Sequence, residues 1–301
     1  MRILSLFDCD LGSIIAYLPE IKSQGFDAVQ ISPLQNTKDD YSKEWWMLYQ
    51  PINFKLGNRL GNKDSLRRLC SEASRNGLII VADAVINHLG SENNMGSLIP
   101  HPNCDRDILS NPSCFKERRN IENWNDRYQV THYCMSLPGL NPSNKLVQQK
   151  IIDMLNEYID LGVQGFRFDA AKSIALPEEG CDFFSNVTYS LNKWLTIIYG
   201  EVLFADKELI RKYSKYMKVL TNNDAYDVKD IIKFIENKDS YLSKDLGYTR
   251  NIRANDINSW YNSICSYYPN TLFYARNYSN DWNSWRTYEV REGNMKLKLK
   301  R

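Results

Sequence analysis

Acidic side chains follow four apolar runs of the sequence at the point where each run ends. Asp83 stands in VADAVINH and Asp169 in GFRFDAAK, while Glu201 stands in IIYGEVL and Asp239 in KFIENKD. Any one of them could be a helix cap or an ordinary loop residue. Carboxylates held together, however, can serve as acid, base and nucleophile in one reaction. Four of them at successive strand ends predict a catalytic cluster at one rim.

The order of strand and helix patterns would bring these carboxylates together. Apolar runs predict eight strands, at residues 3–7, 28–31, 78–85, 165–168, 196–199, 217–220, 231–235 and 271–275. Apolar stripes at helical spacing predict helices at 11–24, at 64–74 with Asp64 as its cap, at 145–161 and at 254–267. Such alternation implies a parallel sheet, and eight units favour a closed (β/α)₈ barrel, a TIM barrel. Catalytic side chains of such barrels stand at the C-terminal ends of the strands.

One segment interrupts this alternation. Residues 89–140 are rich in Asn, Pro, Ser and Cys and show little periodicity, over a length too great for an ordinary loop. We therefore predict a small subdomain inserted after the third strand. The catalytic barrel would comprise residues 1–88 and 141–278. A C-terminal tail, 279–301, would follow without a C-terminal β domain, its basic ending in solvent.

Composition excludes several classes of function. A net charge of +2 gives no reason to expect nucleic acid or an anionic membrane as a partner. No apolar run approaches the roughly 18 residues of a membrane span. No export signal is visible, so we expect a cytoplasmic monomer, or a secreted protein if an upstream segment is missing. The seven cysteines contain no C-x-x-C pair, which argues against zinc; Cys104 and Cys114 could bridge or stay free.

The four acidic segments resemble, in order, the four motifs of the alpha-amylase family, glycoside hydrolase family 13. DAVINH is similar to the first motif, GFRFDAAK to the second, GEVL to the third and FIENKD to the fourth. The resemblance covers nearly all of residues 3–276, includes the stretch WWMLYQPINFKLGNRLG, and is strongest to compact bacterial amylases. It implies a barrel that cleaves α-1,4-glucosidic bonds in starch- or glycogen-type glucans and maltooligosaccharides, with retention.

The resemblance also implies roles for single residues. Asp169 would be the nucleophile, Glu201 the acid/base and Asp239 the stabiliser of the transition state. Retaining glycosidases hold nucleophile and acid about 5–5.5 Å apart, so that one attacks the anomeric carbon while the other protonates the leaving oxygen. Arg167 lies two residues before Asp169 on the same strand face, where it would keep the nucleophile ionised and oriented.

Further residues match positions that contact the sugar in this family. His88 would donate a hydrogen bond in the cleavage subsite and Tyr49 would be a stacking platform, with Trp46 and Lys172 near flanking sugars. The predicted substrate-binding residues are Tyr49, Trp46, Asp83, His88, Arg167, Lys172 and Lys238.

The sequence departs from the family pattern at several positions. Lys238 replaces a histidine of the fourth motif, and lysine is a flexible point charge instead of a planar donor. Ser173 replaces a histidine that contacts bound sugar. Gly139, in LPGLN, replaces an aspartate that ligates a structural calcium, while Asn87 and Thr131 match other calcium positions. Since a hard cation prefers charged oxygen ligands, we expect low affinity for Ca²⁺ and no other cofactor.

Three hypotheses follow. The first is an active α-glucan hydrolase with reduced activity, because loss of one positioned donor costs about 10²–10³ in rate. The second is a degenerate barrel that binds glucan or a protein partner without turnover, motivated by the departures. The third is a transglycosylase of the same family, which shares every carboxylate and differs only in its products.

Overall fold

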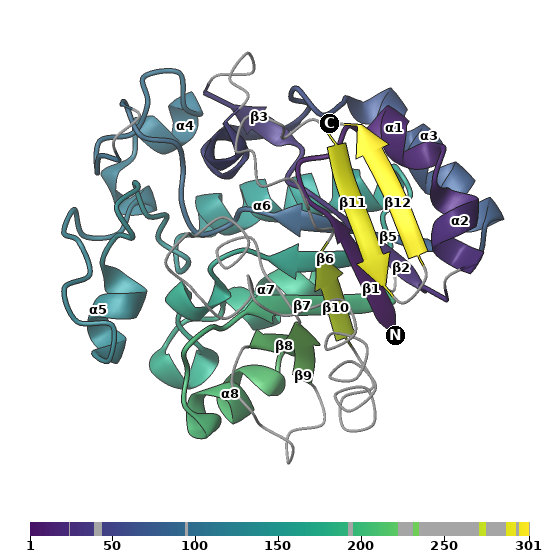
Figure 1. The fold of residues 1–301 in the computed structure, drawn as a ribbon. Coiled ribbons are helices and arrows are strands. Elements are labelled where there is room, and N and C mark those ends of the chain that lie inside the picture. Colours follow the sequence, from purple (N-terminus) through teal and green to yellow (C-terminus); the bar gives the residue numbers. More distant parts are fainter. Residues whose placement is uncertain are drawn as a thin grey trace.

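A ring of parallel strands forms the centre of the molecule (Figure 1). The computed structural model describes residues 1–23, 25–38, 44–93, 96–191, 195–221, 231–234, 271–274, 287–292 and 295–300. Its ring contains β1 (Arg2–Leu6), β2 (Ala28–Ile31), β5 (Ile79–Ala84), β6 (Gly165–Phe168), β7 (Ile197–Glu201), β8 (Lys218–Thr221), β9 (Ile231–Phe234) and β10 (Thr271–Tyr274). Each strand pairs in parallel with the next, and β1 pairs with both β2 and β10, which closes the sheet.

The strand predictions agree with this sheet. β2 and β6 have the predicted bounds, and the other six strands differ by one or two residues at an end. All four residues of β2 and of β6 are buried, as expected for strands covered on both faces. The predicted parallel α/β barrel sheet is therefore confirmed.

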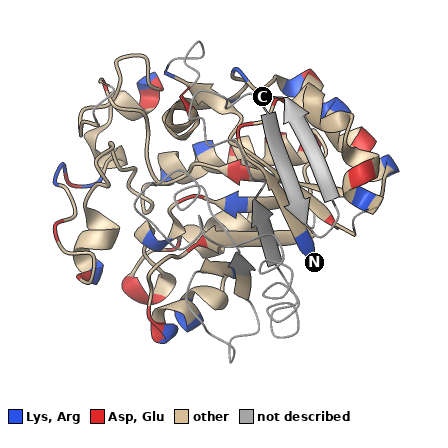
Figure 2. Cartoon of the chain, in the orientation of Figure 1, with Lys and Arg blue, Asp and Glu red and all other residues tan. Residues whose placement is uncertain are grey.

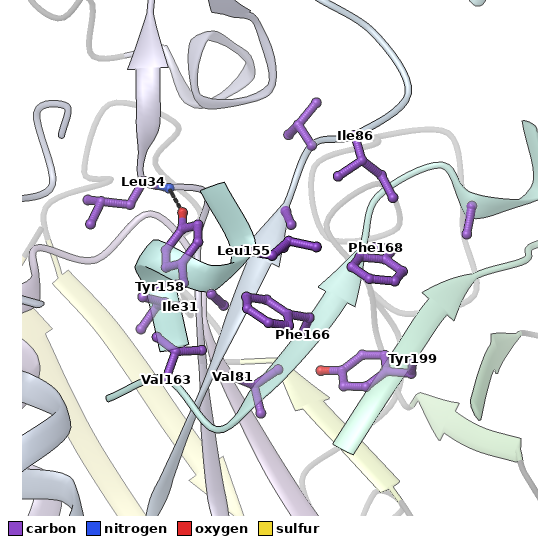
Figure 3. Close-up of a cluster of buried hydrophobic side chains, with 14 of the residues drawn as sticks. Ile31, Leu34, Val81, Ile86, Leu155, Tyr158, Val163, Phe166, Phe168 and Tyr199 are labelled. Atoms are coloured by element: carbon purple, nitrogen blue, oxygen red, sulfur yellow. Dashed lines mark hydrogen bonds between the residues drawn. The ribbon is translucent and has the colours of Figure 1, made fainter. Parts of the chain in front are cut away.

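Helices cover the outside of the sheet. They are α1 (Leu11–Ile15), α2 (Leu18–Ser23), α3 (Lys63–Arg75), α6 (Lys145–Asp160), α7 (Phe183–Tyr189) and α8 (Lys207–Ser214). In Figure 3, Leu155 and Tyr158 of α6 pack against Phe166 and Phe168 of β6. The Tyr158 hydroxyl accepts a hydrogen bond of 3.1 Å from the Leu34 amide, so this core also fixes the loop after β2.

Two helix predictions need correction. The single helix expected at 11–24 is two helices, α1 and α2. Pro19 has no N–H to bond the Ile15 carbonyl, so the first helix ends and a second begins with the proline in its first turn. The cap of α3 is Asn62 and not Asp64, because the Asn62 side chain accepts from the Ser65 amide. The helix predicted at 254–267 lies outside the described residues.

The segment between β5 and α6 contains its own short elements. These are α4 (Arg106–Leu109), the 3₁₀ helix η2 (Pro112–Cys114) and α5 (Arg127–His132), which lie to one side of the barrel in Figure 1. Asp105, Asn111 and Asp126 cap them through side-chain hydrogen bonds. Cys104 and Cys114 are buried free thiols. The boundaries proposed for an inserted subdomain at 89–140 remain a prediction.

Short elements that the patterns did not indicate surround the barrel. Near the start are a hairpin of β3 (Gln35–Thr37) and β4 (Pro51–Leu56) and the 3₁₀ helix η1 (Trp45–Tyr49). Two further 3₁₀ helices, η3 (Ala171–Ser173) and η4 (Pro177–Glu179), follow β6.

The solvated tail predicted at 279–301 stays a prediction, and this range contains two strands. β11 (Thr287–Glu292) and β12 (Met295–Lys300) pair as an antiparallel hairpin, drawn in yellow in Figure 1. The alternation of Lys and Leu in β12 has the period of two that suits a strand.

The outer helices carry charges of both signs (Figure 2). On α3, Arg67 pairs with Asp64 and Arg75 with Glu72, each three residues apart on the exposed face. Among the described residues, no helix is both long enough and apolar enough to cross a membrane.

Candidate active site

Three adjacent strands supply the residues of the candidate site. Asp83 of β5 lies in register beside Arg167 of β6, Asp169 directly follows β6, and Glu201 is the last residue of β7. Neighbouring side chains of a strand point to opposite faces. Phe166 and Phe168 therefore pack outward against α6, whereas Arg167 points into the barrel.

A hydrogen bond across the barrel also indicates that the side of β6 and β7 that carries Arg167 and Tyr199 faces the interior. Tyr199, in register with Arg167 on β7, donates a hydrogen bond of 2.5 Å to Oε1 of Gln30 on β2. Two strands, β5 and β6, separate β7 from β2 in the ring, so this bond crosses the lumen. The Gln30 amide in turn donates to the Ser5 hydroxyl at 3.3 Å. A polar layer therefore lies inside the barrel.

The Arg167 guanidinium holds three carboxylates. Its Nη1 lies 2.7 and 2.8 Å from the two oxygens of Asp83 and 2.7 Å from Oδ1 of Asp169. Its Nη2 lies 2.5 Å from Oε1 of Glu201, an ion pair that lacks the alignment of a hydrogen bond. The arginine is fully buried, and the three carboxylates are nearly so. One cation thus brings together Asp83 and the two predicted catalytic residues of the described chain.

The charges of this cluster do not balance. Burial lowers the pKa of Arg167, but Asp83, Glu201 and Asp169 outweigh it and raise that pKa well above its ordinary value. The guanidinium therefore stays charged. Three carboxylates around one cation leave two negative charges uncompensated when all three ionise.

Tyr49 and His88 extend the cluster. The Tyr49 hydroxyl donates a hydrogen bond of 2.7 Å to Oδ2 of Asp83, and its ring lies 6.4 Å from that of Phe7. Nε2 of His88 lies 3.0 Å from the Tyr49 carbonyl, an acceptor, so this nitrogen carries the proton. Only 7% of Tyr49 is exposed, and its role as a sugar platform stays a prediction.

The backbone between Asp169 and Glu201 is tightly packed. Ala170 adopts a left-handed conformation with φ of 50°, and its amide donates to Oε2 of Glu201 at 3.3 Å. A Cβ atom on Gly200 would lie only 2.6 Å from Cβ of Ala171. The absence of a side chain at Gly200 therefore lets the turn after Asp169 reach the glutamate.

Some predicted residues do not join the cluster. Trp46 is 39% exposed and packs edge-to-face on Trp45, with ring centroids 6.1 Å apart. The Lys172 ammonium donates to the Phe204 carbonyl at 3.2 Å, and burial lowers its pKa. Lys238 and Asp239 lie outside the described residues.

The two calcium candidates are not brought together. Oδ1 of Asn87 accepts a hydrogen bond of 2.8 Å from Lys116. The Thr131 hydroxyl donates at 2.9 Å to the Arg127 carbonyl of its own helix. Within the described part of the chain, no group of three or more His, Cys, Asp or Glu side chains could hold a metal ion.

Three buried or half-buried charged residues, Asp8, Lys116 and Arg127, were not predicted from the sequence. Asp8 follows β1, is buried and pairs with Arg59. The acid-after-strand pattern used for the other carboxylates would have identified it. Lys116 and Arg127 bind backbone carbonyls after β6, and no local pattern marks them.

A closed parallel α/β barrel with carboxylates at the C-terminal ends of its strands has the TIM-barrel architecture, in which functional residues gather at that face. The family model for the alpha amylase catalytic domain matches residues 7–264. The chain therefore belongs to the alpha-amylase family, which confirms the resemblance of its motifs.

Relatives named alpha-amylase support this assignment. The chain is 38% identical over 237 residues to one from Clostridium acetobutylicum, covering 74% of this chain and 30% of the relative. It is 37% identical over 162 residues to one from Thermomonospora curvata, covering 50% of this chain and 26% of that protein. The chain thus spans less than a third of the length of these relatives.

Solved structures share the fold at low identity. A variant of alpha-amylase I from Eisenia fetida, in complex with maltohexaose, has a TM-score of 0.73 at 19% identity, covering 94% of this chain and 69% of that one. The alpha-amylase from Geobacillus thermoleovorans, in complex with acarbose, has a TM-score of 0.72 at 20% identity, covering 91% of this chain and 69% of that one.

Proposed function

We propose that this chain hydrolyses α-1,4-glucosidic bonds in starch- or glycogen-type glucans, with retention at the anomeric carbon. The observation that carries the proposal is the contact of one buried guanidinium with Asp83, Asp169 and Glu201. Family membership and the names of the relatives support the substrate class. Maltohexaose and acarbose in the related structures support an oligosaccharide of glucose as the bound form.

In the proposed mechanism Asp169 attacks the anomeric carbon while Glu201 donates its proton to the leaving glycosidic oxygen. The C–O bond breaks, one glucan leaves with a new hydroxyl, and the other is esterified to Asp169. Glu201, now ionised, then removes a proton from water, whose oxygen attacks the anomeric carbon and releases Asp169. Two displacements restore the original configuration and the original protonation states.

The remaining residues orient and stabilise these steps. Arg167 keeps the nucleophile ionised, and Tyr49 limits the rotation of Asp83. Asp239 is proposed to stabilise the positive charge of the transition state. Lys238 and Ser173 replace histidines of the family pattern, so we propose an activity reduced by about 10²–10³ for each lost donor.

Hydrolysis of a blocked chromogenic maltooligosaccharide by the purified chain tests the proposal. We expect turnover by the wild type, background release by Asp169→Asn, and wild-type rates for Asp64→Asn, whose side chain is 90% exposed on α3. NMR of the first product should show the α-anomer. A wild-type rate equal to that of Asp169→Asn would overturn the proposal, and binding of maltoheptaose without product would then favour a binding barrel.

A further inference from the structure

Lys116 makes an unusual contact between the 89–140 segment and the barrel. Its amino group donates hydrogen bonds of 2.8 Å to Oδ1 of Asn87 and 2.6 Å to the carbonyl of Ser173. Asn87 follows β5, and Ser173 ends the 3₁₀ helix after Asp169. Lys116 is only 7% exposed, and Asn87 and Ser173 are 2% and 1% exposed. A buried amine thus joins the loops that follow two catalytic strands.

The acceptors are of the kind that a hard cation binds. Side-chain and backbone carbonyl oxygens are typical Ca²⁺ ligands, and Asn87 is one of the calcium positions expected from the family resemblance. In this chain Nζ of Lys116 already lies within hydrogen-bonding distance of both oxygens. A metal ion bound by the same two oxygens would occupy the position of the amine.

The space at residue 139 is matched to the lysine. A Cβ atom on Gly139 would lie 2.9 Å from Cδ of Lys116 and 3.4 Å from Sγ of Cys134. The Lys116 amide also donates to the Gly139 carbonyl at 2.9 Å. An aspartate at this position, the expected calcium ligand, would therefore collide with the stem of Lys116. The lack of a carboxylate at residue 139 and the presence of Lys116 are therefore linked, because both side chains would need the same space.

A second basic side chain acts on the same turn. Arg127 of α5 donates to the carbonyls of Lys172 and Ile174, on either side of Ser173, the latter at 3.2 Å. Three consecutive carbonyls after the proposed nucleophile thus accept bonds from Lys116 and Arg127. The guanidinium adds positive charge near the amine, which makes a divalent ion there still less favourable.

We propose that the amino group of Lys116 replaces a structural metal ion in this chain, linking Asn87 and Ser173 and making the fold independent of calcium. The residues present do not fit a metal, because the oxygen ligands are taken and the carboxylate is missing. Burial lowers the pKa of Lys116 to about 7. Both the charged and the neutral amine carry the two N–H groups that these acceptors need, so the link persists in either form.

Thermal unfolding of the full chain, followed by circular dichroism with CaCl₂ or with a chelator, tests this proposal. We expect the same Tm for the wild type in both conditions. Lys116→Met should lower Tm by about 5 °C, because two buried acceptors lose their donor, and calcium should not restore it. Lys63→Met, which removes a half-exposed lysine from α3, should change Tm by no more than about 1 °C.

A double variant reverses the replacement. Lys116→Ala with Gly139→Asp vacates the amine position and supplies a carboxylate, so Tm should rise with added CaCl₂ and fall with chelator. A wild type that loses stability in chelator and regains it with calcium would overturn the proposal, as would a folded double variant without a calcium response. The wild-type measurement needs no variant to fold. None of these readouts uses hydrolysis, so failure here is distinct from failure of the proposed activity.

Discussion

Nη1 of Arg167 donates a hydrogen bond of 2.7 Å to Oδ1 of Asp169, two residues further along the chain. Both residues are buried: Arg167 is fully buried, and Asp169 is 4% exposed. The cation that orients the proposed nucleophile therefore comes from the same strand end. A charge held in place by the fold in this way is a form of preorganisation, which lowers a barrier without reorganisation during the reaction.

Removal of the Arg167 guanidinium should strongly lower the free energy of unfolding. Arg167→Met leaves three buried carboxylates without their counter-ion, and we expect a loss of about 3–5 kcal/mol in the free energy of unfolding, measured by urea denaturation. Arg167→Lys keeps the charge without the planar fork and should lie between. Arg67→Met, which breaks only an exposed pair on α3, is the control. A change for Arg167→Met no larger than that of the control would contradict the role of the arginine.

The Tyr49 hydroxyl should contribute to the free energy of unfolding through its hydrogen bond to Asp83. Tyr49→Phe removes one buried donor to Asp83 and should destabilise the protein by about 1–3 kcal/mol. Tyr189→Phe, on a side chain that is 89% exposed, should have almost no effect. Equal denaturation midpoints for the two variants would show that Asp83 does not need this donor.

Gly200 should not tolerate even a methyl group. Gly200→Ala places its Cβ 2.6 Å from Cβ of Ala171, and overpacking of this kind costs about 1–3 kcal/mol. Because Glu201 is the next residue, the displacement should also lower kcat. Ala171→Gly removes one of the colliding atoms, so the double variant should recover part of both losses. Unchanged stability in Gly200→Ala would mean that the turn after Asp169 can move freely.

The contact between α5 and the barrel should depend on pH. Burial raises the pKa of Glu179, but hydrogen bonds from Arg127 and the Leu176 amide outweigh it and hold that pKa below its ordinary value of 4.5. The pair therefore stabilises the fold fully above that value and is lost as pH falls through the folded-state pKa. The difference in Tm between wild type and Glu179→Gln should be largest near neutral pH and shrink below pH 4.5. A difference independent of pH would exclude the ionised pair as its cause.

Part of the sheet could be predicted from the sequence because strands such as β2 and β6 are buried on both faces. AVQI of β2 and GFRF of β6 are short, mostly apolar runs, and their predicted bounds match the structure. Acidic residues at or near the ends of the predicted strands then identified Asp83, Asp169 and Glu201 as neighbours. The helix predictions were wrong where a single residue sets a helix end. Pro19 divides the helix predicted at 11–24, and Asn62 instead of Asp64 caps α3.

The contacts made by the 89–140 segment could not be predicted. Lys116 is 29 residues from Asn87 and 57 from Ser173, and no periodic pattern connects them. Arg127 donates to the Ile174 carbonyl, which is 47 residues away, so local sequence patterns do not indicate this contact either. These bonds arise only when the barrel has arranged the loops. The motif comparison indicated a missing calcium carboxylate at Gly139 but not the side chain that fills the space.

The pairing of β1 with β10, which closes the barrel, can form only late during synthesis of the chain. Arg2 pairs with Thr271, so β1 acquires one of its two neighbours only after a strand 269 residues further along the chain has been made. Contacts between such distant segments are slow to form, because the entropy of closing a long loop is lost before the contact is gained. During translation β1 therefore exposes the edge that β10 later covers, since β2 pairs with its opposite edge, and an open edge of this kind can associate with other nascent chains.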